Sequence, residues 1–345
     1  MIIIPRKTRR DMQTTPELIS QISKENTNLI KQFIEYLKAT GKSTTTIHAY
    51  TNDLYLFFVW NLQNNDNKFF VDFTKRDVMR YQSFLIGDLE LSSNRIRRRK
   101  ATLSSLSNFI ESMMDDIYEN YKPIINKIPS PPKQEVREKT VLEEEQIEKL
   151  LNYLVENKQY QKACVLALAI SSGARKSELL RFKVSYFTEK NIIYNSLYKT
   201  PEKIKTKGKG TGKFINKYVI VAQFKPYLDL WMKQREELGI TSDELFMTKR
   251  EGKWKPLQIT GIDSYAETFS KILGLDFYWH ACRHRFTTAM CKCNIPASII
   301  KDVVGWESVS MVDIYDDTEV DDELGKYFDA DGIKMIERKD LSDLE

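Results

Sequence analysis

Ser171-Ser172-Gly173-Ala174-Arg175-Lys176-Ser177-Glu178-Leu179 joins two helical patterns in the second half of this 345-residue chain. The nearly continuous apolar segment from Tyr160 to Ser171 predicts a buried helix. Gly173 is a natural end for that helix, because glycine readily takes the left-handed conformation found at helix C-termini. Arg175 then opens the next helix, so the stretch predicts a cationic side chain at the junction of two helices.

The segments around this junction predict a second domain that is mostly helical, with a small antiparallel sheet. Leu142 to Asn157 is amphipathic and begins with acidic residues, as the N-terminus of a helix favours. Ile192-Ile193-Tyr194 and Tyr218-Val219-Ile220-Val221 predict strands around the glycine- and lysine-rich stretch 205–213. Helical patterns return over 222–238, 258–273, 279–293, 296–304 and 308–316.

Four helical patterns with short connections come before this domain and predict a small bundle. The first has apolar residues at helical spacing from Leu29 to Leu37 and stops at Gly41. The others carry apolar faces over 46–58, 78–85 and 96–110, and the second of these opens at Thr74 or Asp77. The proline-rich segment Ile128-Pro129-Ser130-Pro131-Pro132 cannot continue a helix and separates the two halves.

The predicted organisation is a tail over 1–24, a core-binding helical domain over 25–127, a linker over 128–140, a catalytic domain over 141–328 and an acidic tail over 329–345. The longest clean apolar run, Leu54 to Trp60, is far shorter than the roughly 20 residues of a membrane helix, so no membrane is expected. Four cysteines are no disulfide framework, which favours the reducing cytoplasm.

Charge is distributed unevenly along the chain. The last 45 residues hold 15 acidic and five basic side chains, whereas the first 300 hold 33 acidic and 48 basic ones. A basic body with an acidic end favours a polyanionic partner. The densest basic run is Arg95-Ile96-Arg97-Arg98-Arg99-Lys100. On a helix edge its five cations would suit the phosphate backbone of duplex DNA, and the alternative is a solvated face.

The segment Tyr278-Trp279-His280-Ala281-Cys282-Arg283-His284-Arg285 admits two interpretations. Together with Cys291 and Cys293 it contains zinc-ligand residue types, but a helix places those two thiols on different faces, which argues against a metal. His280 and Arg283 share one face at spacing i, i+3, where a guanidinium can bind two phosphate oxygens and an imidazole can move a proton. The chain has no phosphate-binding loop, dinucleotide fingerprint or acidic two-metal cluster.

Five motifs in order make the chain similar to the phage-integrase family of tyrosine recombinases, over about residues 25–328. They are the Gly173–Leu179 turn, the lysines of 205–213, His280-Ala281-Cys282-Arg283, Val304-Gly305-Trp306, and Tyr315 nine residues after Trp306. The resemblance implies a mainly α, integrase-type fold, with a four-helix core-binding domain and an α+β catalytic domain that contains a small antiparallel sheet.

The resemblance also implies a site-specific DNA recombinase in which Tyr315 attacks the phosphodiester and retains a 3′-phosphotyrosine. The bond energy is then conserved, so no ATP and no other cofactor is expected. By resemblance, Arg175 and Arg283 hold the two non-bridging oxygens, His280 assists proton movement, and Glu178 orients Arg175 unless it is a surface charge. Such cations are needed because a phenol is a poor nucleophile at neutral pH.

The lysine that protonates the 5′-oxygen leaving group is the open assignment. Lys203, Lys205, Lys207, Lys209 and Lys213 all lie in or near the predicted hairpin. Family members place this lysine in Thr-Lys or Gly-Lys-Gly settings, which favours Lys207, then Lys209, then Lys205. The lysines that are not the proton donor, Lys205 first among them, would contact phosphates.

Two features depart from the family pattern. Trp306 stands where most members have histidine, and its indole N–H can donate to the phosphate but cannot move a proton. Its alternative role is packing. Asp313, Asp316 and Asp317 flank Tyr315, where like charge would raise the pKa of the phenol unless the side chains point away.

Strand exchange between two duplexes needs four active sites, so the resemblance implies a homo-tetramer on double-stranded DNA with a specific site. Leu324, Tyr327 and Phe328 would dock on a neighbouring protomer. The same interpretation fits a mobile element, accessory directionality or bending proteins, and a nucleoid-associated location in the cytoplasm. Two alternatives remain open: a non-catalytic DNA-binding architectural protein, and a relaxing enzyme like the type IB topoisomerases.

Overall fold

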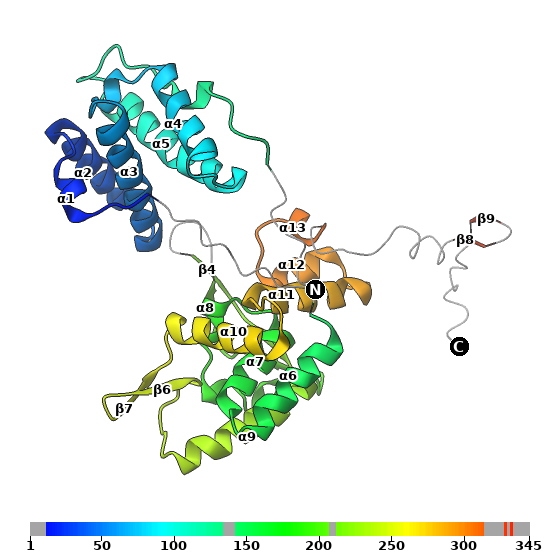
Figure 1. Cartoon of the computed structure of the whole chain (residues 1–345). Helices are drawn as coiled ribbons and strands as arrows, with labels where there is room; N and C mark the ends of the chain where they lie inside the picture. Colours follow the sequence, from blue (N-terminus) through cyan, green and yellow to red (C-terminus); the bar gives the residue numbers. More distant parts are fainter. Residues whose placement is uncertain (1–11, 134–141, 207–211, 314–327, 330–331, 334–345) are drawn as a thin grey trace. The chain divides into compact units, whose positions relative to one another are not determined.

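The computed structural model describes residues 12–133, 142–206, 212–313, 328–329 and 332–333. The chain divides into two compact units, Met1–Glu138 and Lys139–Glu345, and each is described by itself. Figure 1 shows the first unit as an all-helical body and the second as helices with short strands.

The first unit is a helical bundle with an aromatic core. Its helices are α1 (Pro16–Ser20), α2 (Lys24–Ala39), α3 (Thr44–Asn64), α4 (Lys75–Gly87) and α5 (Ser93–Met113), with 3₁₀ turns at Phe70–Asp72 and Ile125–Lys127. The four long helices match the four predicted patterns. Thr74, not Asp77, begins α4, and the two residues form a capping box in which each side chain accepts from the other's backbone N–H.

Both ends of this unit extend beyond the predicted boundaries. Helix α1 and the buried Ile22 belong to the bundle, so the predicted tail over 1–24 is too long. The sequence pattern did not indicate α1, because a helix of five residues is too short to show a period and begins only through the Thr15 cap and Pro16. At the other end, Ile128 is buried and the carbonyl of Pro129 accepts from Gln82, so the predicted linker begins within the bundle.

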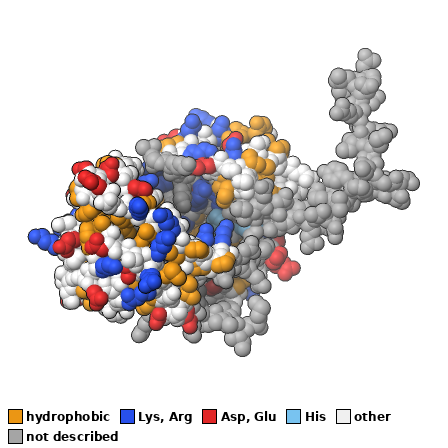
Figure 2. Space-filling model, turned by 90° about the horizontal axis from the view of Figure 1, so that it is seen from above, with side chains coloured by type: hydrophobic (Ala, Val, Ile, Leu, Met, Phe, Trp, Pro, Cys, Tyr) orange, Lys and Arg blue, Asp and Glu red, His pale blue; other side chains and the backbone are white. Residues whose placement is uncertain are grey.

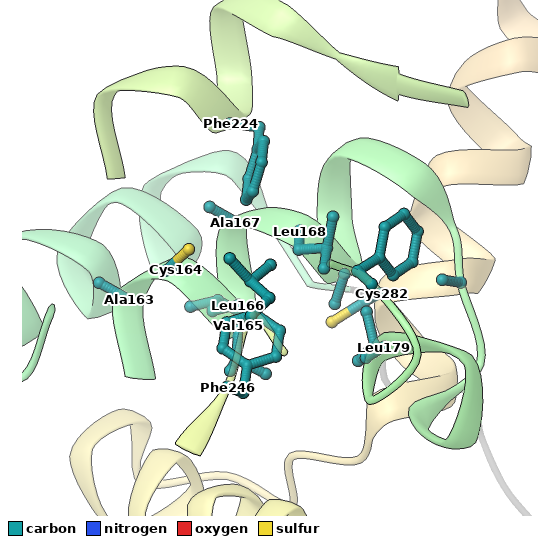
Figure 3. Packing of buried hydrophobic residues seen from close by; sticks show 14 of the residues in the cluster. Ala163, Cys164, Val165, Leu166, Ala167, Leu168, Leu179, Phe224, Phe246 and Cys282 are labelled. Atoms are coloured by element: carbon teal, nitrogen blue, oxygen red, sulfur yellow. The ribbon is translucent and has the colours of Figure 1, made fainter. Parts of the chain in front are cut away.

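The second unit is built on α7. Its helices are α6 (Glu144–Glu156), α7 (Tyr160–Ser172), α8 (Lys176–Leu179), α9 (Val221–Glu237), α10 (Ile259–Leu273), α11 (Trp279–Lys292), α12 (Ala297–Val304) and α13 (Ser310–Asp313). Residues Cys164 to Ala169 of α7 are fully buried. Figure 3 shows Cys164 to Leu168 packed with Leu179, Phe224, Phe246 and Cys282, which come from other parts of the unit. This packing holds the C-terminal end of α7 beside α8 and α11.

Short antiparallel strands complete the second unit. The strands β1 (Ile192–Ile193), β2 (Leu197–Lys199) and β5 (Tyr218–Ile220) form a sheet in the order β1-β2-β5. The strands β3 (Ile204–Thr206) and β4 (Lys213–Ile215) form a separate hairpin pair, with Thr206 opposite Lys213. Two further pairs are β6 (Met247–Arg250) with β7 (Lys253–Pro256), and β8 (Phe328–Asp329) with β9 (Gly332–Ile333).

The β6–β7 hairpin was not predicted from the sequence. Glu251 and Gly252 connect its strands, and both have positive φ, as a type I′ turn requires. Glutamate is uncommon at such a position, and β7 consists of Lys253-Trp254-Lys255-Pro256 with mostly exposed side chains. The turn therefore lacked its usual residues and the strand lacked a clear alternation.

Candidate active site

Four separate segments of the second unit meet around Glu178. They are the α7–α8 turn with Arg175, strand β3 with Thr206, Lys217 just before β5, and the face of α11 that carries Arg283. The carboxylate of Glu178 lies at the centre and is fully buried. The structure thus brings together Arg175, Glu178 and Arg283, which the sequence predicted, with two polar residues that it did not.

Glu178 fixes the position of Arg175 by two kinds of contact. Its Oε1 accepts from Arg175 Nη1 at 2.7 Å, and its Oε2 accepts from the Arg175 backbone N–H at 3.0 Å. The Thr206 hydroxyl donates to Oε1 and itself accepts from Arg175 Nη1 at 2.6 Å. The alternative that Glu178 is a surface charge is therefore wrong, and its contacts fit a role in orienting Arg175.

The charge of Glu178 is secured by its neighbours. Burial by itself would raise the pKa of this carboxyl, but the Lys217 ammonium, the bonds from Lys217 and Thr206, and the Arg175 charge lower the pKa to about 2. Glu178 therefore remains an anion at neutral pH. Arg175 is only partly buried, with 24% of its side chain exposed, so its guanidinium is held from inside and accessible from outside.

Arg283 is held at the C-terminal ends of two helices. Its Nη1 donates to the Gly173 carbonyl at 3.0 Å and its Nη2 donates to the Val304 carbonyl at 2.9 Å. Gly173 and Gly305 end α7 and α12 in the left-handed conformation, and the negative ends of the helix dipoles favour a cation there. Arg283 has no exposed surface in this structure, unlike Arg175.

His280 lies at the start of α11, one turn before Arg283, as the spacing predicts. Its side chain is exposed at the surface. Partial loss of hydration lowers the pKa of His280, and the positive charges of Arg283 and Arg175 lower it further. The imidazole is therefore neutral at neutral pH, which is the form that can accept a proton.

Trp306 is largely buried and follows the left-handed Gly305. The Arg283 guanidinium lies 5.2 Å from the centre of its ring, a cation–π contact. Lys213 Nζ donates to the Trp306 carbonyl at 3.2 Å, and the ring packs in a small cluster with Phe286, Ile300, Val304 and Val312. These contacts support the packing role, and a donor role toward phosphate remains a prediction.

Several predicted site residues lie outside the described part of the chain: Lys207, Lys209, Tyr315, Asp316 and Asp317. Lys203 and Lys205 are described and exposed, and Lys205 lies on β3 between the buried Ile204 and Thr206. Lys205 is therefore accessible from solvent, and its predicted phosphate contact stays a prediction. The assignment of the proton donor stays a prediction.

The basic run in the first unit divides between two faces of α5. Arg95, Arg97 and Arg98 are exposed, although Arg98 also pairs with Asp53 at 2.7 Å. Arg99 and Lys100 are buried, and Lys100 Nζ donates to the Ile128 carbonyl. Their burial does not support the predicted DNA contact, which stays a prediction for these two residues. The helical period turns positions 99 and 100 toward the core face that Ile96 and Leu103 also occupy.

Arg97→Ala is expected to change DNA binding, whereas Arg99→Ala is expected to change the stability of the fold. Arg97→Ala should weaken binding to all DNA sequences alike and make the slope of log K against log salt shallower by about 0.9 per lost contact. Arg99→Ala should leave that slope unchanged and cost about 0.5–3 kcal/mol of stability, because it removes a buried side chain. Salt titrations of binding and thermal unfolding check both. An unchanged slope for Arg97→Ala would show that the exposed run is only solvated.

The histidines and cysteines of α11 do not gather at one point. Cys282 is buried, Cys291 is half-buried and Cys293 is exposed. Within the described residues, no three His, Cys, Asp or Glu side chains are placed to share a metal ion.

In the same part of the chain, no helix has both the length and the apolar character that crossing a membrane requires.

Lys217 and Thr206 are the site residues that sequence reasoning missed. Lys217 has no exposed surface, and its Nζ lies 2.8 Å from Glu178 Oε2 and 3.3 Å from the Val304 carbonyl. Burial lowers the pKa of Lys217 and the Glu178 carboxylate raises it, while the charges of Arg283 and Arg175 lower it, to about 8 overall. A lysine beside a strand gives no sign in the sequence that it is buried.

Comparison with known proteins agrees with this geometry. The model of the Phage integrase family matches residues 140–321, and that of the Phage integrase N-terminal SAM-like domain matches residues 29–120. The chain belongs to the phage integrase family. The predicted fold class and the predicted enzyme class are thereby confirmed: it is a tyrosine recombinase, an enzyme that breaks and rejoins DNA at specific sites.

Individual relatives of this recombinase include a prophage-derived recombinase-like protein and a tyrosine recombinase. The SPbeta prophage-derived recombinase-like protein YomM of Bacillus subtilis (strain 168) is 30% identical over 266 residues, which cover 76% of this chain and 77% of that protein. Tyrosine recombinase XerA of Pyrococcus horikoshii is 24% identical over 292 residues, covering 84% and 89%.

A solved lambda integrase dimer bound to a COC′ core site has a TM-score of 0.62 at 15% identity and covers 90% of this chain and 99% of that one. The XerH recombinase bound to palindromic difH, also with a TM-score of 0.62, is 20% identical and covers 87% and 83%. At this level of identity the two structures support the fold assignment.

Proposed function

We propose that this recombinase exchanges strands between specific duplex sites through a 3′-phosphotyrosine on Tyr315, as a homo-tetramer on DNA. The observation that carries the proposal is the cluster in which a buried carboxylate holds Arg175 beside Arg283 and His280. Fixed cations of this kind stabilise charge on a phosphate without having to reorganise during the reaction. The alternative of a non-catalytic architectural protein gives no reason for such a cluster.

The proposed roles follow from the contacts. Arg175 binds one non-bridging oxygen directly, because its guanidinium is held by Glu178 and remains partly exposed. Arg283 binds the second oxygen, and since it is enclosed in this structure, DNA binding must uncover it. The neutral His280 accepts or passes on the phenolic proton of Tyr315, and Lys207, with Lys209 as the alternative, protonates the leaving 5′-oxygen.

The DNA partner is supported by charge and by relatives. Figure 2 shows Lys and Arg side chains at several places on the face in view. Positive side chains of this kind can neutralise the phosphates of a DNA backbone. The solved XerH and lambda integrase complexes contain a difH substrate and a core site, respectively. Transposase A of Tn554, 23% identical, and the prophage-derived YomM support a mobile element as the context. Accessory directionality or bending proteins and a nucleoid location in the cytoplasm complete the proposal.

A nicked suicide substrate tests this function. Sites are first recovered by selection from random DNA, and a nick is placed so that the short fragment carrying the released 5′-hydroxyl diffuses away after cleavage. We expect the protein to remain covalently attached to the 3′ end in denaturing gels. Binding without any adduct would support the architectural alternative. Relaxation of supercoils without a specific site would support the topoisomerase-like one.

A further inference from the structure

We propose that Lys217 is a positioning residue for catalysis, whose buried ammonium links the support of Arg175 to the support of Arg283. The inference rests on the proposed phosphate-binding role of these two arginines. Lys217 is assigned a positioning role and not a phosphate contact because its ammonium is paired with the buried Glu178 carboxylate, and neither side chain has any exposed surface. Its effect must therefore pass through the groups that it holds.

The first link runs through Glu178. Lys217 Nζ lies 2.8 Å from Oε2 of this carboxylate, and neither side chain has any exposed surface. The same Oε2 accepts from the Arg175 backbone, and Oε1 accepts from its guanidinium. Arg175 is partly exposed and cannot by itself offset the cost of burying a full negative charge, so Lys217 supplies the enclosed counter-charge.

The second link runs through the end of α12. The Val304 carbonyl accepts from Lys217 Nζ at 3.3 Å and from Arg283 Nη2 at 2.9 Å. One carbonyl at the negative end of a helix therefore serves both cations. This carbonyl immediately precedes Gly305 and Trp306. A shift of Lys217 would therefore also displace Arg283 and the Trp306 ring that Arg283 contacts.

The backbone of Lys217 is fixed as firmly as its side chain. Its N–H donates to the Thr200 hydroxyl at 2.9 Å, and its carbonyl accepts from the Thr200 N–H at 3.0 Å. Lys217 thus has little freedom to follow a moving Glu178. A rigid lysine of this kind suits the positioning of a phosphate clamp, for which a displacement of about 1 Å can cost on the order of 10²-fold in rate.

Removing the lysine should raise the pKa of Glu178, because the largest charge that lowers it is lost. The groups that face this carboxylate are Arg175 from the α7–α8 turn, Thr206 from β3 and Lys217, with Arg283 near Lys217 on α11. Burial raises the pKa of Glu178. In a variant without Lys217, mainly Thr206 and Arg175 remain to lower it. Below the raised pKa the carboxyl is neutral and holds Arg175 weakly, and above it the carboxylate holds Arg175 again.

The experiment measures single-turnover adduct formation at saturating nicked DNA, from neutral to mildly alkaline pH. Each variant is compared with the wild type at the same pH, because wild-type Lys217, with a pKa of about 8, itself loses charge across this range. For Lys217→Met we expect unchanged DNA affinity, cleavage slowed on the order of 10²-fold at neutral pH, and partial recovery as the pH rises. Lys217→Arg, which keeps the charge, should cleave faster than Lys217→Met and show no such recovery. A folded Lys217→Met that cleaves at the wild-type rate with the wild-type pH profile would overturn the proposal.

Two further variants separate positioning from stability. Arg235 is also a buried cation of this unit, but it donates to the carbonyls of Ser242, Glu244 and Leu245 away from the site. Arg235→Met should lower the melting temperature and leave the cleavage pH profile unchanged. If it acquires the same alkaline recovery as Lys217→Met, the effect is general destabilisation and the proposal fails.

If Lys217→Met does not fold, the double variant Glu178→Gln/Lys217→Met provides the test, since it removes both buried charges together. We expect this variant to cleave slowly and without alkaline recovery, because no carboxyl remains to ionise. Wild-type cleavage by the double variant would overturn the inference. Absence of any adduct from the wild-type protein would instead contradict the proposed function, so the two failures are distinguishable.

Discussion

Tyr315→Phe is expected to bind its DNA site with unchanged affinity and to form no covalent adduct. The substitution removes one hydroxyl, so the charges that bind the duplex are retained while the only atom able to attack the phosphate is lost. Gel-shift titration measures the affinity, and denaturing gels of nicked substrates measure the adduct. Because Tyr315 lies outside the described residues, its position nine residues after Trp306 is the basis of this prediction.

Tyr327→Phe is the matched control, since Tyr327 is the next tyrosine along the chain and also lies outside the described part. It should form the adduct at the wild-type rate. An adduct from Tyr315→Phe, together with loss of the adduct in Tyr327→Phe, would move the nucleophile to Tyr327. The cluster around Arg175 would then still bind phosphate, and only the assignment of the tyrosine would change.

Lys207→Ala is expected to be slow on ordinary DNA, by roughly 10²–10⁴-fold, and nearly normal on DNA whose bridging 5′-oxygen is replaced by sulfur. A general acid matters only when the leaving group needs a proton. A thiolate leaves unprotonated because its pKa is far lower than that of an alcohol. Single-turnover cleavage of the two substrates measures the ratio, which cancels any loss of DNA affinity that the variant suffers.

Lys205→Ala is the control for this experiment, because Lys205 is exposed on β3 and is assigned to phosphate contact. It should be impaired equally on both substrates. Rescue of Lys209→Ala in place of Lys207→Ala would move the general acid by two residues. If sulfur rescues none of the three variants, the proton comes from elsewhere, and His280 becomes the first residue to test in the same way.

The helical part of the fold could be predicted because its signal is local. The run from Tyr160 to Ser171 became α7, which ends one residue later, and the apolar spacing from Leu29 to Leu37 lies inside α2, which begins earlier, at Lys24. Such patterns follow from the 3.6-residue period and need no knowledge of the partner. The β6–β7 hairpin and the five-residue α1 escaped because short elements have too few residues to show a period.

The catalytic motifs were visible in the sequence because they combine residue type with fixed spacing. His280 and Arg283 lie three residues apart on α11 and so share a face by geometry, whereas Arg175 caps the N-terminus of α8 and Glu178 is the third residue of that helix. The basic run 95–100 shows the limit of the same reasoning. The period separates its residues into faces, but it does not say that the face with Arg99 and Lys100 meets the core.

The sequence by itself thus determined the helical architecture, the basic character and the family, and it named the candidate residues of the active site. Only the tertiary structure decided which cations are enclosed and what each one holds. Arg283 finds the Gly173 carbonyl 110 residues away in the chain, and Lys217 finds the Val304 carbonyl 87 residues away. A buried charge is tolerated only where distant segments supply its partners, and no local pattern records those partners.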